Sequence, residues 1–148
     1  MSIQRPAVFD AYSCPIGTFP IAPSAVDAVK NGRFCKINAK GQIVLPAAGD
    51  KAWMVVFPNE LPKKGFATNL GAFLIGPYAC YVDNDTFDDS KTYKVGDPLY
   101  CDAEGKLTNV KAGNGIIVAY VIKGVKDYAG KKIIKIRSQQ KYQVVASS

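Results

Sequence analysis

The sequence predicts an all-β protein, either a small barrel or a sandwich of short antiparallel strands, with a β-tulip-like outline and at most one short helix. Three observations lead to this fold class. Short runs rich in β-branched and aromatic residues recur along the chain, Gly or Pro clusters separate them, and helical spacing is nearly absent. The chain of 148 residues is 48% hydrophobic and 21% charged, which is enough to bury one core and fits a single domain.

Residues 1–23 are predicted to form an extended N-terminal arm. The segment holds four of the nine prolines and several aromatic residues, and neither a helical nor an alternating period runs through it. Proline is excluded from helix interiors and from central strands. The first residues also lack the charged and apolar regions of a secretory signal. The arm either contacts a neighbouring subunit or packs on its own domain, and its candidate partner-binding residues are Arg5, Phe9, Tyr12 and Phe19.

Residues 24–148 are predicted to form a single β-rich body. The one expected helix is Ser24–Asn31, because Ser24 can cap its N-terminus and Gly32 can end it. The predicted strands outside the central stretch are Arg33–Ile37, Gln42–Pro46, Ala52–Phe57, Tyr78–Val82, Lys132–Arg137 and Tyr142–Val145.

The central stretch Tyr93–Gly124 is expected to alternate strands and turns. Asn114-Gly115 is typical of a tight hairpin turn, because both residues tolerate a positive φ. The run Ile116–Ile122 follows it and is almost entirely β-branched and aromatic, which predicts a central strand buried on both faces. No residue of the stretch is chemically reactive.

Two segments of the body have the same order of signals. Residues 32–57 and 96–121 each contain a Gly, an aromatic residue followed by Cys, a turn that ends in Gly, a second Gly turn and an apolar strand. These segments are either two copies of a duplicated three-strand unit or an ordinary β-meander, in which Gly turns recur without duplication.

Composition argues against an enzyme. The chain has no histidine, so it lacks the commonest general base, the usual partner of a Ser or Cys nucleophile and the commonest metal ligand. Ser138–Lys141 matches the S-x-x-K motif, but none of the motifs that accompany it in β-lactamases is present. No catalytic residue and no cofactor are therefore expected.

The potential metal ligands also fail to form a known site. Cys14, Cys35, Cys80 and Cys101 lie too far apart for a C-x-x-C motif, and we expect them to be reduced and buried. The acidic loop 83–89 resembles part of a calcium loop, but it lacks the Gly at the sharp turn and the closing Glu. No metal site is predicted, and whether this loop binds a cation stays open.

The charge favours acidic partners. The net charge is +7, and the basic residues are spread over both halves of the chain. In the strand Lys132–Arg137, Ile134 and Ile136 face one way while Lys135 and Arg137 face the other. Lys135 and Arg137 are therefore candidate partner-binding residues on a half-exposed strand near a sheet edge.

The segments VKNGRFCKINAKGQIVLPAAGD and YKVGDPLYCDAEGKLTNVKAGNGIIVAYVIKG resemble the body of capsid decoration (cement) proteins from tailed bacteriophages. The resemblance covers residues Val29 to Gly124 as a pattern of strands and Gly turns, and it transfers no individual residue as a site. It implies a small β-rich body with a terminal arm that binds between major capsid subunits, often as a trimer. The four cysteines and the basic balance depart from the family.

The expected function is a viral structural protein that binds the outer capsid shell and stabilises contacts between major capsid subunits. The expected partners are the major capsid protein and neighbouring decoration subunits, with the chain forming a homotrimer. The expected location is the capsid surface of the virion, and the host cytoplasm before assembly. No membrane partner is expected, because the apolar runs are too short. Two alternatives stay open. One is an OB-like barrel that binds single-stranded nucleic acid through Tyr78, Tyr81, Phe87, Tyr93 and Tyr100, and the other is a tail- or fibre-associated adhesion module.

Overall fold

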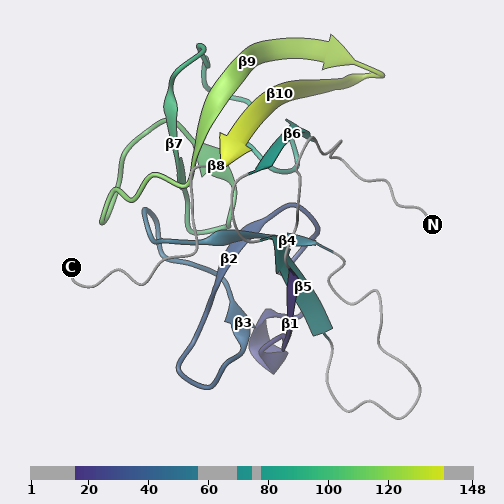
Figure 1. Ribbon diagram of the computed structural model, residues 1–148, viewed down its shortest axis with the longest axis vertical. Helices are drawn as coiled ribbons and strands as arrows, with labels where there is room; N and C mark the ends of the chain where they lie inside the picture. The colour runs from purple at the N-terminus through teal and green to yellow at the C-terminus, as the bar shows by residue number, and fades with distance from the viewer. Residues whose placement is uncertain (1–15, 57–69, 75–77, 139–148) are drawn as a thin grey trace.

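The computed structural model describes residues 16–56, 70–74 and 78–138 of the chain. They form two antiparallel sheets of five strands each, which do not close into a barrel and are arranged as a sandwich (Figure 1). The all-β prediction is confirmed, in its sandwich form. The first sheet contains β1 (Ile16–Pro20), β2 (Phe34–Ile37), β3 (Ile43–Val44), β4 (Trp53–Val56) and β5 (Leu70–Leu74). The second contains β6 (Tyr78–Asp83), β7 (Pro98–Cys101), β8 (Leu107–Thr108), β9 (Ala119–Tyr128) and β10 (Lys131–Ser138).

The chain enters the first sheet before residue 23. Strand β1 pairs with β5 along its whole length, from Ile16 opposite Leu74 to Pro20 opposite Leu70. Pro20 is tolerated there because β1 lies at the edge of its sheet. Residues 16–20 of the predicted arm thus form an edge strand of the first sheet, and residues 1–15 lie outside the described ranges.

The predicted helix Ser24–Asn31 is largely wrong. A single 3-10 turn spans Pro23–Ala25, and the turn that follows it has one α-type hydrogen bond, from the amide of Val29 to the carbonyl of Ala25 at 3.0 Å. Its N-cap position is Ala22, which has no side chain able to cap the turn, and Pro23 is the first helical residue. Ala25 and Val29 are buried against the first sheet, so tertiary packing holds this segment without a regular helix.

The two sheets have the same topology. The strand order is β1-β5-β4-β2-β3 in the first and β6-β10-β9-β7-β8 in the second, so each strand corresponds to the strand five places later. A parallel bridge joins Ile21 to Ile43 in the first half, and a parallel bridge joins Phe87 to Leu107 at the corresponding place in the second. We call residues 16–74 the first repeat and residues 78–138 the second repeat.

Individual hydrogen bonds recur between the repeats at a constant offset of 64 positions (105 − 41 = 64). Asn38 Oδ1 accepts from the amides of Lys40 and Gln42, each at 2.9 Å. Asp102 Oδ1 accepts from the amides of Glu104 and Lys106 at 2.8 and 2.9 Å. Short polar side chains close both turns in the same way, because Asn and Asp can imitate a turn of the backbone.

The positions of the two turns show which strand residues correspond. Ile37 pairs with Ile43 in the first repeat, and Cys101 pairs with Leu107 in the second. Cys101 therefore corresponds to Ile37, whereas an alignment on the aromatic-Cys pairs would match it to Cys35. That Gly, turn and strand signals recur at equivalent structural positions is what a duplicated unit would produce, and the duplication itself stays a proposal.

The second half of the central stretch differs from the prediction. Strand β7 lies between β8 and β9 in the sheet. Asn114-Gly115 therefore does not connect a hairpin. Strand β9 begins only at Ala119, and Ile116 is 38% exposed. The two-residue hairpin turn lies instead at Ala129-Gly130, where φ is +53° and +82°.

Two hydrophobic clusters divide the first sheet between its faces. One face carries Cys35, Val55 and Phe73 and packs on the segment 21–29. The other face belongs to the main cluster, which it shares with the inner face of the second sheet. The residues of the first sheet in that shared core are Phe34, Met54, Val56, Ala72 and Leu74. The first sheet therefore lies between its own small core and the second repeat.

Close backbone contacts fix the two repeats against each other. The amide of Phe34 donates to the carbonyl of Gly105 at 2.7 Å, and a Cβ at Gly105 would lie 2.7 Å from the carbonyl oxygen of Phe34. Arg33 donates from its guanidinium to the carbonyls of Asp85 and Glu104 at 3.0 and 2.9 Å. A residue with a Cβ atom therefore does not fit at position 105 unless the backbone of Phe34 shifts.

Candidate functional site

The outer face of the second sheet contains the described residues that are best placed to bind a partner. On β10, Ile134 and Ile136 are fully buried, whereas Lys135 is half-buried and Arg137 is exposed. This alternation is the one predicted for the strand Lys132–Arg137, because successive strand residues point to opposite faces. The two predicted partner-binding residues of this strand therefore lie together on the outer face.

The predicted arm residues do not share that face. Phe19 is half-buried and packs on the small core of the first repeat, with its ring centroid 5.8 Å from that of Phe73. Its role in the described part of the chain is therefore packing within its own sheet. Arg5, Phe9 and Tyr12 lie outside the described residues.

Tyr81 lies at the centre of a basic cluster on the outer face. It is opposite Lys135 in the β6–β10 register. The ammonium groups of Lys126 and Lys135 lie 5.4 and 5.3 Å from its ring centroid. Each distance is within the range of a cation–π attraction, so the ring attracts both cations.

The sequence pattern could have indicated this position of Tyr81. In β6, Tyr78, Cys80 and Val82 are buried and the residues between them are half-exposed. That alternation is visible in the sequence, but the pairing with lysines from β9 and β10 depends on strand order, which the sequence does not reveal.

The hairpin of β9 and β10 extends the basic surface beyond the sheet. It projects away from the rest of the molecule in Figure 1, and every residue from Val125 to Lys132 is exposed. Residues 119–138 contain one acidic residue, Asp127, and six basic ones, which are Lys123, Lys126, Lys131, Lys132, Lys135 and Arg137. Much of the net positive charge of the chain is therefore concentrated on this hairpin and the adjoining face.

Four of the five aromatic residues considered for base stacking are in the core. Tyr78, Phe87, Tyr93 and Tyr100 are between 0% and 7% exposed, so their ring faces cannot receive a base. Phe87 and Tyr93 contact each other edge to face at 5.4 Å. Only Tyr81 is available at the surface, and it is flanked by lysines.

The acidic loop 83–89 is held by internal hydrogen bonds and one lysine. Lys131 Nζ lies 3.4 Å from Asp83 Oδ2 and 3.1 Å from Asp85 Oδ2, and these carboxylates raise the pKa of Lys131. Asp88 Oδ1 accepts from the amide and hydroxyl of Ser90, which lowers the pKa of Asp88. Within the described ranges, no group of three or more Cys, Asp or Glu side chains is arranged to hold a metal ion.

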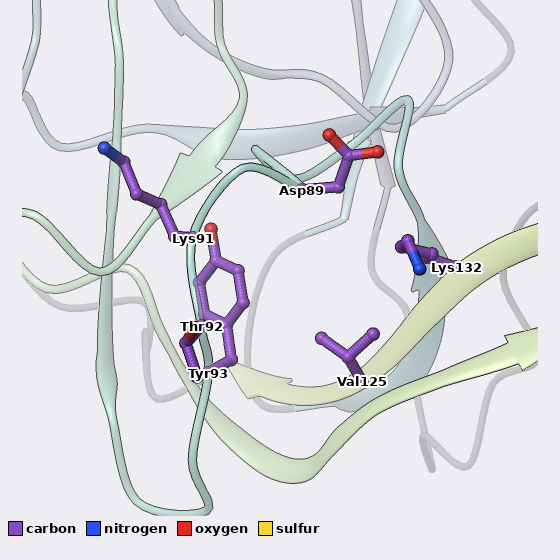
Figure 2. Close-up of a pocket in the computed structure, with 6 residues that line it drawn as sticks. All are labelled: Asp89, Lys91, Thr92, Tyr93, Val125 and Lys132. Carbon is purple, nitrogen blue, oxygen red and sulfur yellow. The ribbon is translucent and has the colours of Figure 1, made fainter.

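A pocket of about 370 Å³ lies between this loop and the base of the hairpin. Figure 2 shows Tyr93 and Lys91 on one side, Val125 and Lys132 on the other, and Asp89 at the gap between them. The Tyr93 hydroxyl donates to the carbonyl of Asp88 at 2.6 Å, and burial raises its pKa. The Tyr93 hydroxyl of this pocket is thus engaged in a local hydrogen bond.

The described cysteines are reduced and buried, as predicted. Cys35, Cys80 and Cys101 are thiols that are at most 1% exposed, whereas Cys14 lies outside the described residues. Burial raises the pKa of Cys35 to about 12 and that of Cys101 to about 11. Ser138, the first residue of the S-x-x-K match, is also buried, at the end of β10.

Comparison with known proteins adds no relative. No protein-family model matches the chain, and a search of curated proteins finds no significant match. Within the described residues, no helix has both the length and the apolar character needed to span a membrane.

Proposed function

We propose that this chain is a structural protein that binds the outer shell of a tailed-bacteriophage capsid and stabilises contacts between major capsid subunits. The observation that carries the proposal is the basic outer face of the second sheet, where Lys126 and Lys135 both lie close to the ring of Tyr81. The resemblance of residues Val29–Gly124 to decoration proteins supports it. A rigid body with a charged face and no reactive group suits a protein that acts by contact alone.

In this proposal, binding depends on electrostatic attraction and on the repeating structure of the shell. Positive charge on one face steers the protein towards an acidic surface and orients it there. Exposed charge pairs contribute little each and are screened by salt, so the affinity of one copy is modest. Copies linked in a homotrimer would bind the repeating shell more tightly than one copy does, because the second and third contacts become intramolecular.

The proposal includes an absence of catalysis, an assembly state and a location. We propose that the chain is not an enzyme, since it contains no histidine. We also propose that it forms a homotrimer on the capsid surface of the virion, in contact with the major capsid protein, after folding in the host cytoplasm. Sedimentation equilibrium of the purified chain tests the trimer, and a monomer at every concentration would contradict it.

Binding to shells tests the proposed function directly. Capsid shells of the encoding virus are prepared without this chain and are sedimented with the purified protein. We expect saturable binding at about 0.15 M salt that weakens as salt is raised towards 0.5 M. Bovine serum albumin in place of the chain is the control for trapping. Absence of saturable binding at 0.05 M salt would overturn the proposal.

One observation favours nucleic-acid binding as a second candidate. Tyr81 is a half-exposed aromatic residue with two lysines close to its ring, which is one element of a stacking platform for single strands. The other four platform residues are buried, so a single ring remains. We expect binding to single-stranded DNA to be weak and lost at physiological salt. A tight complex that Tyr81→Ala weakens would favour this second function.

A further inference from the structure

The two repeats use the same face differently. In the first repeat, Phe34, Met54 and Val56 project from the outer side of the sheet into the core shared with the second repeat. Phe34 is opposite Met54 in the first sheet, and Pro98 is opposite Tyr120 in the second. Pro98, Tyr120 and Ile122 of the second repeat therefore correspond to Phe34, Met54 and Val56, in that order. These three residues are half-exposed. The face that binds a whole repeat in the first sheet is therefore open in the second.

The adjoining strand completes the correspondence. Val55 is opposite Phe73, and Val121 is opposite Ile136, so Ala72 and Leu74 correspond to Lys135 and Arg137. The shared core of the first repeat receives two apolar residues at these positions, and the second repeat has two cations there. The open face thus has an apolar half on β7 and β9 and a basic half on β10.

We propose that this open face, formed by Pro98, Tyr120, Ile122, Lys135 and Arg137, is the docking surface of the chain for an acidic protein surface with an apolar centre. The inference rests on the proposed function and names the surface that the shell would contact. Tyr and Arg are enriched at the centres of protein interfaces, because they combine contact area with hydrogen bonding. The apolar half supplies burial, and Lys135 and Arg137 select carboxylates.

Charge distinguishes the occupant from a second copy of the chain. The internal contact would be imitated between copies only if this face met the opposite side of a first repeat. That side is already packed on segment 21–29, and its half-buried margin carries Lys51 over Trp53. A copy would therefore bring cations to cations, whereas an acidic partner neutralises them.

The apolar half distinguishes the occupant from nucleic acid. Two of the three residues of the apolar half, Pro98 and Ile122, offer neither an aromatic ring to stack on bases nor a side-chain hydrogen bond to phosphate, so Tyr120 is its single aromatic ring. In a surface that binds single strands, aromatic rings are expected along the path of the backbone. On this face the basic residues lie on one side of an apolar patch, which is the arrangement of a protein interface with a polar rim.

The test compares two charge reversals of equal size. Lys135→Glu with Arg137→Glu changes the docking face, and Lys30→Glu with Lys40→Glu changes two exposed lysines of the first repeat by the same charge. Binding to the stripped capsid shells is measured at about 0.15 M salt, with thermal melting to verify folding. We expect the first pair to weaken binding about tenfold or more and the second by less than about threefold. Lys135→Arg with Arg137→Lys keeps both charges and should bind nearly as the wild type does.

A third variant separates the apolar half from the charge. Tyr120→Ala keeps every charge and removes the largest side chain of the apolar half, and we expect binding to weaken about fivefold or more. Equal losses in the two charge reversals, or no loss with either Tyr120→Ala or the reversal at Lys135 and Arg137, would overturn the docking face while the wild type still binds shells. If the wild type itself does not bind shells, the proposed function fails as well. Tighter binding of the wild type to a 20-residue oligo(dT) than to shells would assign the face to nucleic acid.

Discussion

Cysteine burial has a consequence that can be measured at single residues. Cys35 is fully buried between β-strands, and its thiol has a pKa of about 12. The thiolate is the reactive form, so the folded protein has almost none at pH 8. In a Cys14→Ser background, Cys35, Cys80 and Cys101 should not react with a thiol reagent at pH 8 until denaturant is added. Rapid labelling of the folded protein would contradict the described packing.

The same pKa shift predicts a loss of stability at alkaline pH. Because the folded state raises the pKa of Cys35 above its ordinary value of 9.0, folding favours the protonated thiol. Its contribution is fully present below pH 9 and is lost as pH rises towards 12. We expect the urea midpoint to fall over this window, and Cys35→Ala should reduce the dependence. An unchanged pH dependence in Cys35→Ala would show that this thiol does not titrate with unfolding.

The side chain of Thr86 is a buried polar group that lowers stability. It is fully buried, and its hydroxyl oxygen has no hydrogen-bond partner among the described residues. A buried hydroxyl without a partner costs about 1–3 kcal/mol. Thr86→Val keeps the shape and removes that group, so the free energy of unfolding should rise or stay equal. Thr108→Val is the control, because the Thr108 hydroxyl accepts from the amide of Val110 at 3.2 Å. Destabilisation by Thr86→Val larger than that of the control would contradict this reading.

At the scale of elements, two equivalent turns give a matched pair of glycines. Gly41 and Gly105 have φ of +79° and +83° and occupy corresponding positions in the two repeats. A Cβ at Gly41 would meet nothing within 4 Å, whereas one at Gly105 would lie 2.7 Å from the carbonyl oxygen of Phe34. Both substitutions to Ala carry the strain of a left-handed backbone, about 1–2 kcal/mol. Gly105→Ala should lower the free energy of unfolding clearly more than Gly41→Ala does, because its Cβ also pushes the turn away from Phe34 of the other repeat.

Chemical denaturation of the two glycine variants measures this difference. Gly41→Ala supplies the strain of the turn alone, so the excess loss in Gly105→Ala reports the contact between repeats. Equal losses of unfolding free energy in the two variants would show that the backbone contact between Phe34 and Gly105 does not constrain the fold.

Strands were more predictable than their connections. The predicted strands at β2, β4, β6 and β10 match because β-branched and aromatic residues form short runs bounded by Gly. Asn114-Gly115 has the sequence of a hairpin, but β7 lies between the strands that it would connect. Ala129-Gly130 forms the actual hairpin turn although Ala rarely adopts a positive φ, because the long pairing of β9 and β10 imposes it.

At the scale of the whole molecule, the sequence contained half of the candidate site. The alternation in Lys132–Arg137 placed Lys135 and Arg137 on an outer face before any strand order was known. Tyr120 and Ile122 could not be added from the sequence, because Ile116–Ile122 is an unbroken apolar run that indicates burial on both faces. Only the pairing of β9 with β7 and β10, and the position of the first repeat, leave that face open.

The repeat organisation also explains why the chain needs few special features to fold. Each repeat pairs strands that lie within about sixty residues of each other, and the second repeat is completed by the outer face of the first. A closed barrel has no sheet edges. The two sheets of this chain stay open, and one face of the second sheet is available for a partner. The open face of the second repeat is the property that connects the fold to the proposed function.

A reconstruction of particles of the encoding virus is the most direct test of shell binding through the second repeat. The account predicts density for the chain on the outer surface, between neighbouring major capsid subunits, with the sheet of β6, β10, β9, β7 and β8 turned towards the shell. Acidic side chains of the capsid should face Lys135 and Arg137. Particles without such density, or chains that contact the shell only through the first repeat, would contradict it.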